Sequence, residues 1–530
     1  MMPIKILVTD PLSEAGLRSL TGDSRFQVVI NTELSQEELF AEIRDADALL
    51  VRSQTTVNRE LINRAPQLKI IGRAGVGVDN IDLEAATEHG IMVVNAPGGN
   101  TNSAAEHTIA MLLSLARNIP QAYQSLKKQE WKRSKYQGIE VKGKTLGVIG
   151  FGKIGAEVAH RAKGQRMNVI AYDPFMTPEK AQKLGILNGS IDDILENADF
   201  ITVHTPLIKE TTHLLNKEAF QKMKQGVRIL NCARGGIIYE AALLEAIEAG
   251  IVAGAALDVF ETEPPFGSKL LERDEVIATP HLGGSTVEAQ ENVAIGISQD
   301  VLHFFSGQAV EHPVNLPAIS KETLHHLAPY FDLAKQLGRF ISFLAYDGIQ
   351  EISIQSSGGL AEHEVSTLAR NVVKGLLERF ASHQINSVNA LYLAEQKGIS
   401  LNESKTTKSG SFPNLLTVEV ISKSGSRIVS GTILEGFGPR IVRVDGYHAD
   451  IAPQGHLLLI EHQDKPGAIG RMGSLLGEHR INIATMQVDR EENGGRAIML
   501  LTVDKHPGTQ AISELERLDD IEKVTAIDLI

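Results

Sequence analysis

The stretch that decides the fold is LGVIGFGKIGAEVAHRAKGQRMNVIAYDPF, residues 146–175. Its first apolar residues predict a strand, a glycine-rich turn follows, and a helix-like segment leads into a second strand. Such a turn gathers backbone N–H groups at the positive end of the helix dipole, which suits a phosphate. The stretch therefore predicts a dinucleotide-binding unit in a doubly wound α/β fold.

The residues of this motif have separate parts in the expected site. Gly150 allows the tight turn, Gly152 lets the backbone approach a pyrophosphate, and Gly155 lets helix and strand pack closely. Asp173 ends the second strand, 18 residues after Gly155, where a carboxylate would accept hydrogen bonds from both ribose hydroxyls. The same charge repels a 2′-phosphate, so we expect NAD rather than NADP as the cofactor.

A complete α/β lobe precedes this motif. Between residues 4 and 95, short apolar runs alternate with helix-like segments, a pattern typical of crossover units around a parallel sheet. We therefore expect two Rossmann-like lobes, with the dinucleotide-binding lobe inserted after the first one.

The rest of the chain predicts two smaller α+β units after a proline-containing linker. We expect an intervening domain over residues 318–452, with a polar Ser/Thr/Lys-rich loop around residues 402–411. Residues 456–530 have the βαββαβ order of a ferredoxin-like module.

Composition excludes several classes of function. The 530 residues are 42% hydrophobic, as in a globular chain with sizeable cores, and the net charge of −13 argues against nucleic-acid or anionic-membrane binding. The single cysteine, Cys232, excludes a disulfide framework or a thiolate metal cluster and suits a reducing compartment. No signal peptide or membrane span is recognised, so we expect a cytoplasmic protein. We also expect no metal site.

Three further motifs follow predicted strands and carry reactive side chains. RILNCARGG contains Arg234, ALDVFETEPP contains Glu263, and VIATPHLGGST contains His281. Taken singly, each is better explained as a surface charge or a loop residue. Together they supply what hydride transfer at a 2-hydroxy acid needs: a base for the hydroxyl proton in His281, a carboxylate to orient it in Glu263, and a guanidinium for the substrate carboxylate in Arg234.

GFGKIG, YDP, NCARGG, DVFETEPP and PHLGGST resemble the D-isomer-specific 2-hydroxyacid dehydrogenases. In that family the equivalents of Arg234, Glu263 and His281 form the catalytic set. The resemblance also implies a substrate-binding lobe made of residues 1–97 and 287–314, around an inserted NAD-binding lobe of residues 98–286. VRSQTTV and IGRAGVGVDNID, with the C-terminal units, are similar to its long members, which oxidise D-3-phosphoglycerate to 3-phosphohydroxypyruvate in L-serine biosynthesis. The resemblance covers the whole chain and implies an NAD-dependent oxidoreductase that assembles as a homotetramer or dimer.

The resemblance also implies which residues contact the ligands. The implied NAD contacts are Val76, Gly150, Gly152, Lys153, Ile154, Gly155, Asp173, Thr205, Cys232, Ala233, Asp258, Gly283 and Gly284. A substrate with a carboxylate and a phosphate needs more than one cation, and the implied substrate contacts are Arg52, Ser53, Arg73, Gly75, Asn100 and, from the partner subunit, Arg133, with Lys132 as the alternative.

The tail LLLIEHQDKPGAIGRMGSLLGEHRINIATMQV resembles an ACT domain. The family implies L-serine as its effector, with His462, Asp464 and Asn482 as candidate contacts. Relatives often carry His-x-Asn where this chain has His462-Gln-Asp464, which changes the donor pattern. A purely structural, dimerising tail is the alternative.

Other functions stay open. A hydroxypyruvate, glyoxylate or 2-oxoglutarate reductase would share the chemistry, but such enzymes usually lack the long tail. The C-terminal-binding-protein corepressors use the same fold as an NAD-sensing binding module and retain the triad. A catalytically idle amino-acid sensor is the third possibility. The ACT-like tail, Arg52 and Arg73 argue against the corepressor, and the intact triad argues against the idle sensor.

Overall fold

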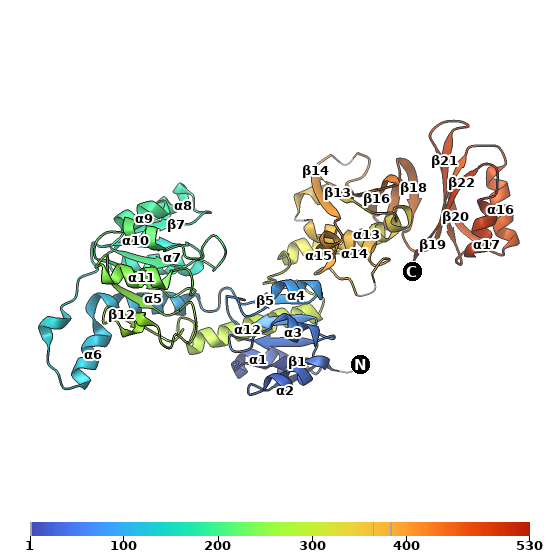
Figure 1. The fold of residues 1–530 in the computed structure, drawn as a ribbon. Helices are drawn as coiled ribbons and strands as arrows, with labels where there is room; N and C mark the ends of the chain where they lie inside the picture. Colours follow the sequence, from blue (N-terminus) through green and yellow to red (C-terminus); the bar gives the residue numbers. More distant parts are fainter. Residues whose placement is uncertain (1–2, 364, 382–383, 409) are drawn as a thin grey trace.

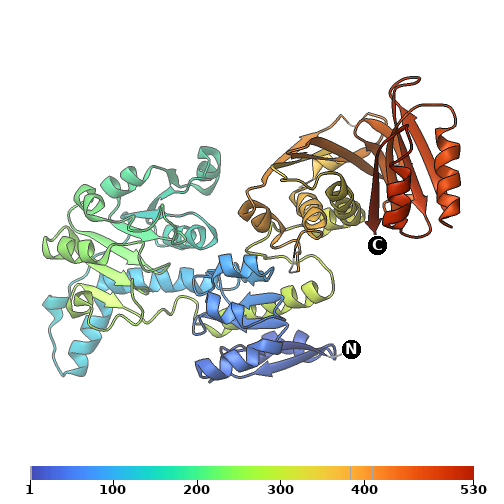
Figure 2. The same cartoon turned by 45° about the vertical axis from the view of Figure 1, so that its right-hand side comes forward.

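The computed structural model describes residues 3–363, 365–381, 384–408 and 410–530. It has two α/β lobes and a C-terminal α+β body, which lies beside the first lobe and away from the inserted one (Figures 1 and 2). The predicted fold class is confirmed. In the part of the chain that is described, no helix has the length and apolar character needed to cross a membrane.

The first lobe surrounds a five-stranded parallel sheet of order β2-β1-β3-β4-β5. Its strands are β1 (Ile4–Val8), β2 (Phe26–Ile30), β3 (Ala48–Val51), β4 (Ile70–Arg73) and β5 (Met92–Asn95). Its helices are α1 (Glu14–Thr21), α2 (Gln36–Glu42), η1 (Ile43–Asp45), α3 (Arg59–Asn63) and α4 (Leu83–Glu88). The late helix α12 (Val287–Phe305) returns to this lobe and packs on α1 and β4, so the second lobe is inserted between β5 and α12.

The inserted lobe surrounds a seven-stranded parallel sheet of order β12-β11-β10-β9-β6-β7-β8. Its strands are β6 (Thr145–Ile149), β7 (Asn168–Tyr172), β8 (Leu187–Asn188), β9 (Phe200–Val203), β10 (Val227–Asn231), β11 (Val252–Leu257) and β12 (Val276–Ala278). Its helices are α5 (Thr101–Arg117), α6 (Ile119–Lys127), η2 (Arg133–Tyr136), α7 (Lys153–Gly164), α8 (Pro178–Leu184), α9 (Ile191–Asn197), α10 (Lys217–Lys222), α11 (Glu240–Glu248) and η3 (Lys269–Glu272). Helices α6 and η2 form an arm that projects from the lobe (Figure 1).

The C-terminal body contains two sheets. The first has the order β14-β13-β15-β16-β17-β18 and the second β20-β21-β19-β22. The strands are β13 (Glu351–Gly358), β14 (Ser400–Thr406), β15 (Asn414–Ser422), β16 (Gly425–Leu434), β17 (Gly438–Val444), β18 (Tyr447–Ile451), β19 (Gly455–Gln463), β20 (Ile483–Arg490), β21 (Arg496–Val503) and β22 (Ile521–Leu529). The helices are α13 (Lys321–Leu344), η4 (Gly359–Glu362), α14 (Ser366–Leu377), α15 (Ala390–Gln396), α16 (Ala468–Glu478) and α17 (Gly508–Leu515).

The prediction of a loop around residues 402–411 is wrong for residues 402–406. Residues 400–406 form β14, an edge strand that pairs in parallel with β13. Its sequence, SLNESKT, has no apolar alternation because most of its side chains are exposed, so the pattern that usually reveals a strand is missing. Residue 409 lies outside the described residues.

The two C-terminal sheets share one apolar core. Helices α16 and α17 cover one face of the four-stranded sheet, while Leu457 and Leu500 on its other face pack in the same cluster as Leu337 and Phe340 of α13. Both pairs are at most 1% exposed. The C-terminal units therefore form one continuous body around α13 rather than two domains with separate cores.

Candidate active site

Two adjoining cavities lie between the two lobes, at the carboxyl ends of their parallel strands, where doubly wound folds bind ligands. We call them the cofactor cavity, of about 760 Å³, and the substrate cavity, of about 780 Å³. Val76, Asp79, Asn100, Arg234 and His281 line both. The two cavities therefore meet at these residues, which we call the junction.

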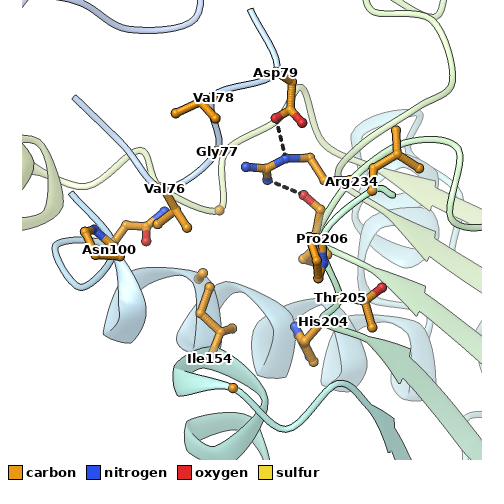
Figure 3. A pocket seen from close by; sticks show the side chains of 18 of the residues that line it. Val76, Gly77, Val78, Asp79, Asn100, Ile154, His204, Thr205, Pro206 and Arg234 are labelled. Atoms are coloured by element: carbon orange, nitrogen blue, oxygen red, sulfur yellow. Dashed lines mark hydrogen bonds and ion pairs between the residues drawn. The ribbon is translucent and has the colours of Figure 1, made fainter. Parts of the chain in front are cut away.

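The glycine turn stands at one end of the cofactor cavity (Figure 3). Gly150 has a left-handed φ of +92°, and a Cβ on Gly155 would lie 2.1 Å from the Gly150 carbonyl oxygen. By contrast, a Cβ on Gly152 would meet no protein atom within 4 Å. Gly152, Lys153 and Ile154 line the cavity at the N-terminus of α7. This open approach to backbone N–H groups fits a pyrophosphate.

Asp173 holds the turn rather than lining the cofactor cavity. One of its carboxylate oxygens accepts from the Phe151 N–H at 2.9 Å and the other from the Phe175 N–H at 2.9 Å. A single carboxylate thus joins the glycine turn to the end of β7. Gly150 and Gly155 likewise shape the turn without lining the cavity.

Six further residues line the cofactor cavity: Thr205, Cys232, Ala233, Asp258, Gly283 and Gly284. Thr205 Oγ1 is buried and has no partner among the described residues, so it is available to a ligand. Burial raises the pKa of the Cys232 thiol to about 12 and lowers the pKa of neighbouring His204 to about 4, so both side chains are neutral near pH 7. Two neutral side chains and a hydroxyl without a partner in the described residues therefore suit the rings and ribose of a dinucleotide beside its pyrophosphate.

His281 and Glu263 form a hydrogen-bonded pair at the junction of the cavities. His281 Nδ1 lies 2.8 Å from Glu263 Oε2, and Glu263 Oε1 accepts from the Phe260 N–H at 3.2 Å. Burial raises the pKa of Glu263, but its contacts with His281 and Phe260 outweigh that effect and leave the pKa below its usual value. An ionised carboxylate is thus fixed beside the imidazole, the arrangement that a general base requires.

Arg234 enters the junction from the end of β10. Its Nε donates to Asp79 Oδ2 at 2.9 Å and its Nη1 donates to the Ala233 carbonyl at 2.7 Å (Figure 3). A Cβ on Gly77 would lie only 1.9 Å from Arg234 Nη2, so the guanidinium lies against the backbone of the first lobe. The sequence prediction missed Asp79, which lies within the quoted motif IGRAGVGVDNID.

Arg52, Ser53, Arg73, Gly75 and Asn100 line the substrate cavity together with Arg234. Burial, followed by the nearby charges of Arg234 and Arg52, lowers the pKa of Arg73 to about 10, so this guanidinium remains charged at neutral pH. Arg73 Nε and Asn100 Oδ1 are buried and have no partner in the described parts of the chain. The cavity therefore presents three cations and unsatisfied polar atoms.

Four predicted residues lie elsewhere. Arg133 is an exposed residue of the arm and lines neither cavity of its own chain. In the ACT-like unit His462 is buried, while Asn482 is exposed. Asp464 accepts from Arg490 Nη1 at 2.7 Å, and this hydrogen bond, with one from the Gly494 N–H, lowers its pKa.

Comparison with known proteins matches three family models. They are the D-isomer specific 2-hydroxyacid dehydrogenase NAD binding domain over residues 109–283, the D-3-phosphoglycerate dehydrogenase intervening domain over residues 326–445, and the ACT domain over residues 456–520. The chain belongs to the D-isomer-specific 2-hydroxyacid dehydrogenase family, the NAD-dependent enzymes that the sequence motifs resemble.

Two relatives match this chain over almost its whole length. D-3-phosphoglycerate dehydrogenase of Bacillus subtilis is 48% identical, with 99% of each chain covered, and that of Archaeoglobus fulgidus is 45% identical, with 99% of this chain and all of the relative covered. Among solved structures, D-lactate dehydrogenase of Aquifex aeolicus in complex with NAD and lactic acid is 30% identical, with a TM-score of 0.53, and covers 59% of this chain and 100% of its own.

Proposed function

We propose that this chain oxidises D-3-phosphoglycerate to 3-phosphohydroxypyruvate with NAD, the first step of L-serine biosynthesis. The observation that carries the proposal is the group of Arg52, Arg73 and Arg234 in one cavity with His281. A phosphorylated 2-hydroxy acid has two anionic ends, whereas D-lactate and D-glycerate have one. Three relatives that match over almost the whole chain are named D-3-phosphoglycerate dehydrogenase, which supports the same substrate.

The roles of the residues follow from their chemistry. Arg234 binds the substrate carboxylate and polarises the oxygen on C2, while His281 accepts the hydroxyl proton and Glu263 stabilises the imidazolium that results. Arg52 and Arg73 bind the phosphate. NAD, when bound, supplies the acceptor for the hydride that leaves C2, and Gly152, Lys153 and Thr205 are among the residues that would hold it.

The test is NADH formation by the purified protein with D-3-phosphoglycerate, D-glycerate and D-lactate. We expect at least a hundredfold higher kcat/KM for the phosphorylated acid. Arg52→Ala should remove a charge-assisted contact worth about 1.5–3 kcal/mol, a 10- to 100-fold loss confined to that acid. Arg25→Ala, on the surface of the same lobe beside Asp23, is the matched control. Equal rates on unphosphorylated acids would overturn the proposal.

We also propose L-serine as an effector of the ACT domain, held by His462, Asp464 and Asn482. Arg490 already occupies Asp464, so the ammonium group of serine must compete with a guanidinium. Asp464→Asn, which creates the His-x-Asn pattern, should therefore strengthen inhibition by serine. If calorimetry detects no binding of serine and the rate does not change, the tail is structural.

The proposal also includes assembly of this chain into a homo-oligomer. Ile119, Tyr123, Leu126 and Trp131 of the arm are each more than half exposed, Trp131 reaching 77%, and such apolar surface favours association. We propose that the arm joins two cytoplasmic protomers and brings Arg133, or Lys132, to the partner's substrate cavity. Light scattering of the wild type and Trp131→Ala tests the association, and Arg133→Ala should raise KM only in the oligomer.

A further inference from the structure

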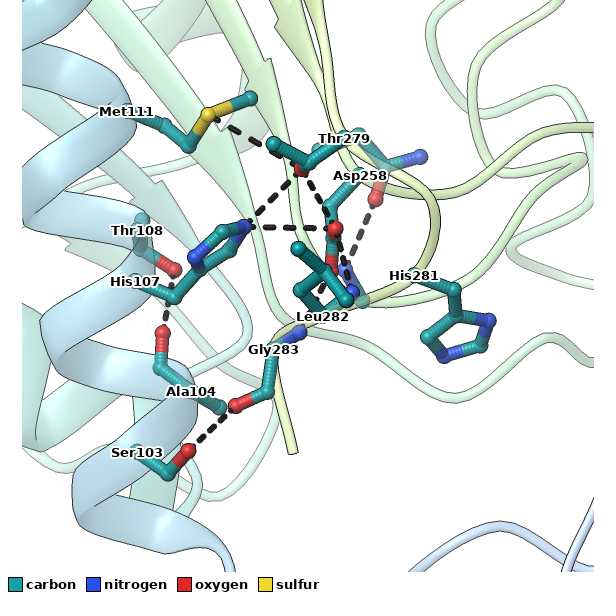
Figure 4. Close-up of polar contacts among 12 residues, drawn as sticks. Ser103, Ala104, His107, Thr108, Met111, Asp258, Thr279, His281, Leu282 and Gly283 are labelled. Atoms are coloured by element: carbon teal, nitrogen blue, oxygen red, sulfur yellow. Dashed lines mark hydrogen bonds and ion pairs between the residues drawn. The ribbon is translucent and has the colours of Figure 1, made fainter. Parts of the chain in front are cut away.

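The loop that carries His281, residues 279–284, is hydrogen-bonded to helix α5 near each end of the loop (Figure 4). Ser103 Oγ donates to the Gly283 carbonyl at 2.8 Å, and one turn further along α5 His107 Nε2 lies 3.0 Å from Thr279 Oγ1. Residues four apart share a helix face, so α5 offers two adjacent supports to one loop.

The loop needs support because His281 has a φ of +55°. A residue other than glycine rarely adopts this left-handed conformation, and it persists only where the surroundings hold it. The His281 N–H donates to the carbonyl oxygens of Asp258 at 2.9 Å and Thr279 at 3.0 Å. The position of the imidazole therefore depends on the segments around Asp258 and Thr279.

The side chain of Asp258 is the centre of these contacts. It is completely buried, and its two carboxylate oxygens accept from the Leu282 N–H at 2.7 Å and the Gly283 N–H at 2.8 Å. Thr279 Oγ1 donates to it at 2.6 Å, and His107 Nε2 approaches the same oxygen to 3.3 Å. A buried charge is tolerated only with its full set of donors, so each donor matters to the loop.

The hydroxyl of Thr279 determines which partner donates in its hydrogen bond with His107. A threonine hydroxyl has one hydrogen, and the short contact with Asp258 uses it, so Oγ1 can only accept from His107. This requires the proton of His107 on Nε2. The contact turns the hydroxyl hydrogen toward Asp258 and away from Met111 Sδ, its other neighbour at 4.0 Å.

The charge state of Asp258 agrees with this geometry. Burial raises its pKa, but the hydrogen bonds from His107, Thr279 and the backbone N–H groups of the loop outweigh burial and leave the pKa below its usual value. Without the donor on His107, the carboxylate would hold the loop less firmly.

We propose that His107 is a positioning residue for His281, acting through Thr279 and Asp258. His107 lines neither cavity, so it reaches the reacting atoms only through this chain of contacts. The kinetic part of the inference rests on the proposed function, because it takes His281 as the base.

Three variants test the proposal. His107→Phe keeps a ring but removes the N–H, His107→Gln keeps an N–H donor, and His160→Phe changes an exposed histidine of α7 as the control. We expect His107→Phe to lower kcat at least tenfold with KM for the acid within twofold. His107→Gln should recover most of that loss, and the control should match the wild type.

A second set tests the chain of contacts. Thr279→Val should lower kcat as His107→Phe does, and the double variant should lose little more, because the two residues act in series. Fully additive losses would overturn the proposal, as would a kcat of His107→Phe within twofold of the wild type. A failure of His107→Gln to recover kcat, with the thermal midpoint lowered in both variants, would show a role in folding only.

A readout that needs no turnover separates this inference from the proposed function. In protein labelled with ¹³C-histidine, the His281 signal, assigned with His281→Asn, should shift or broaden in His107→Phe and stay unchanged in His160→Phe. If the wild type oxidises no 2-hydroxy acid, the proposed function fails, while the His281 signal still decides whether His107 positions that ring. An unchanged signal in His107→Phe overturns the inference.

Discussion

Asp79 Oδ2 lies 2.9 Å from Arg234 Nε, and this ion pair links the two lobes at the junction of the cavities. Asp79 follows β4 in the first lobe, whereas Arg234 follows β10 in the inserted lobe. A carboxylate of the chain thus occupies a donor that a substrate carboxylate would use. It also balances part of the positive charge of the substrate cavity.

Replacing Asp79 tests that competition. Asp79→Asn keeps the shape but removes the charge, and we expect the KM for the acid to fall two- to fivefold with little change in kcat. The pair is partly exposed and is worth about 1 kcal/mol at most, which sets this limit. Asp192→Asn, in a surface pair with Lys222, is the control. A higher KM would mean instead that Asp79 orients Arg234.

The contact between Glu263 and His281 predicts a graded loss of activity. His281→Asn removes the base and should lower kcat by about 10³-fold or more, whereas Glu263→Gln keeps a polar contact and should cost about 10²-fold. Steady-state rates near pH 7 measure both. Equal losses would mean that the imidazole cannot act without its carboxylate.

The lowered pKa of Glu263 also predicts how stability depends on pH. The carboxylate is stabilised by His281 against the opposing effect of burial, so its contribution is present above the unfolded pKa, about 4.3. It is lost as the pH falls through the lower folded value. Thermal midpoints of the wild type and Glu263→Gln should therefore differ near pH 6 and converge near pH 3.

Two glycines of one turn should respond to alanine in opposite ways. Gly152→Ala meets no protein atom, so the thermal midpoint of the free protein should hold while the Kd for NAD rises at least tenfold. Gly155→Ala would press on the Gly150 carbonyl and should cost about 1–3 kcal/mol of folding stability. Calorimetry with and without NAD separates the two effects. A stable Gly155→Ala protein would contradict the close packing.

Asp173 should govern the choice between NAD and NADP. Asp173→Asn keeps an acceptor for one of the two N–H groups but removes the charge that repels a 2′-phosphate. The ratio of kcat/KM for NAD to that for NADP should fall at least tenfold. An unchanged ratio, with the thermal midpoint lowered, would confine Asp173 to holding the turn.

Cys232 should be unreactive in the folded protein. Its pKa is raised from 9.0 to about 12, chiefly by burial, so the thiolate fraction near pH 8 falls about 10³-fold relative to an unshifted thiol. Alkylation by iodoacetamide, followed by mass spectrometry, should be fast only after unfolding in urea. Rapid alkylation of the native protein would restore Cys232 as a candidate nucleophile.

Local patterns were enough to predict the lobes and the NAD motif. The glycine spacing, the apolar runs and Asp173 are each encoded within about 30 neighbouring residues, and the structure places Gly150, Gly152 and Gly155 in one turn. The motifs of Arg234, Glu263 and His281 each follow a strand of the same sheet. Their convergence could be expected because parallel strands end at one edge.

Contacts between distant segments could not be predicted in the same way. His107 meets Thr279 across more than 170 residues, and Asp79 meets Arg234 across more than 150. In both cases each partner is an ordinary polar residue in its local context. The strand β14 was missed because an exposed edge has no apolar period, and the shared core of the C-terminal sheets was missed because each sheet looks complete by itself.

The shared core of the two C-terminal sheets limits how the function of the last domain can be tested by mutation. Leu457 and Leu500 of the four-stranded sheet share one buried cluster with α13, and β22 packs on that helix, so a chain cut at residue 452 would expose part of this core. Truncation is therefore a poor way to ask what the last 75 residues do, since loss of regulation and loss of folding would occur together. Helix α16 packs on the opposite face of that sheet, so substitutions on its surface leave the shared core intact. Such substitutions can therefore separate loss of regulation from loss of folding.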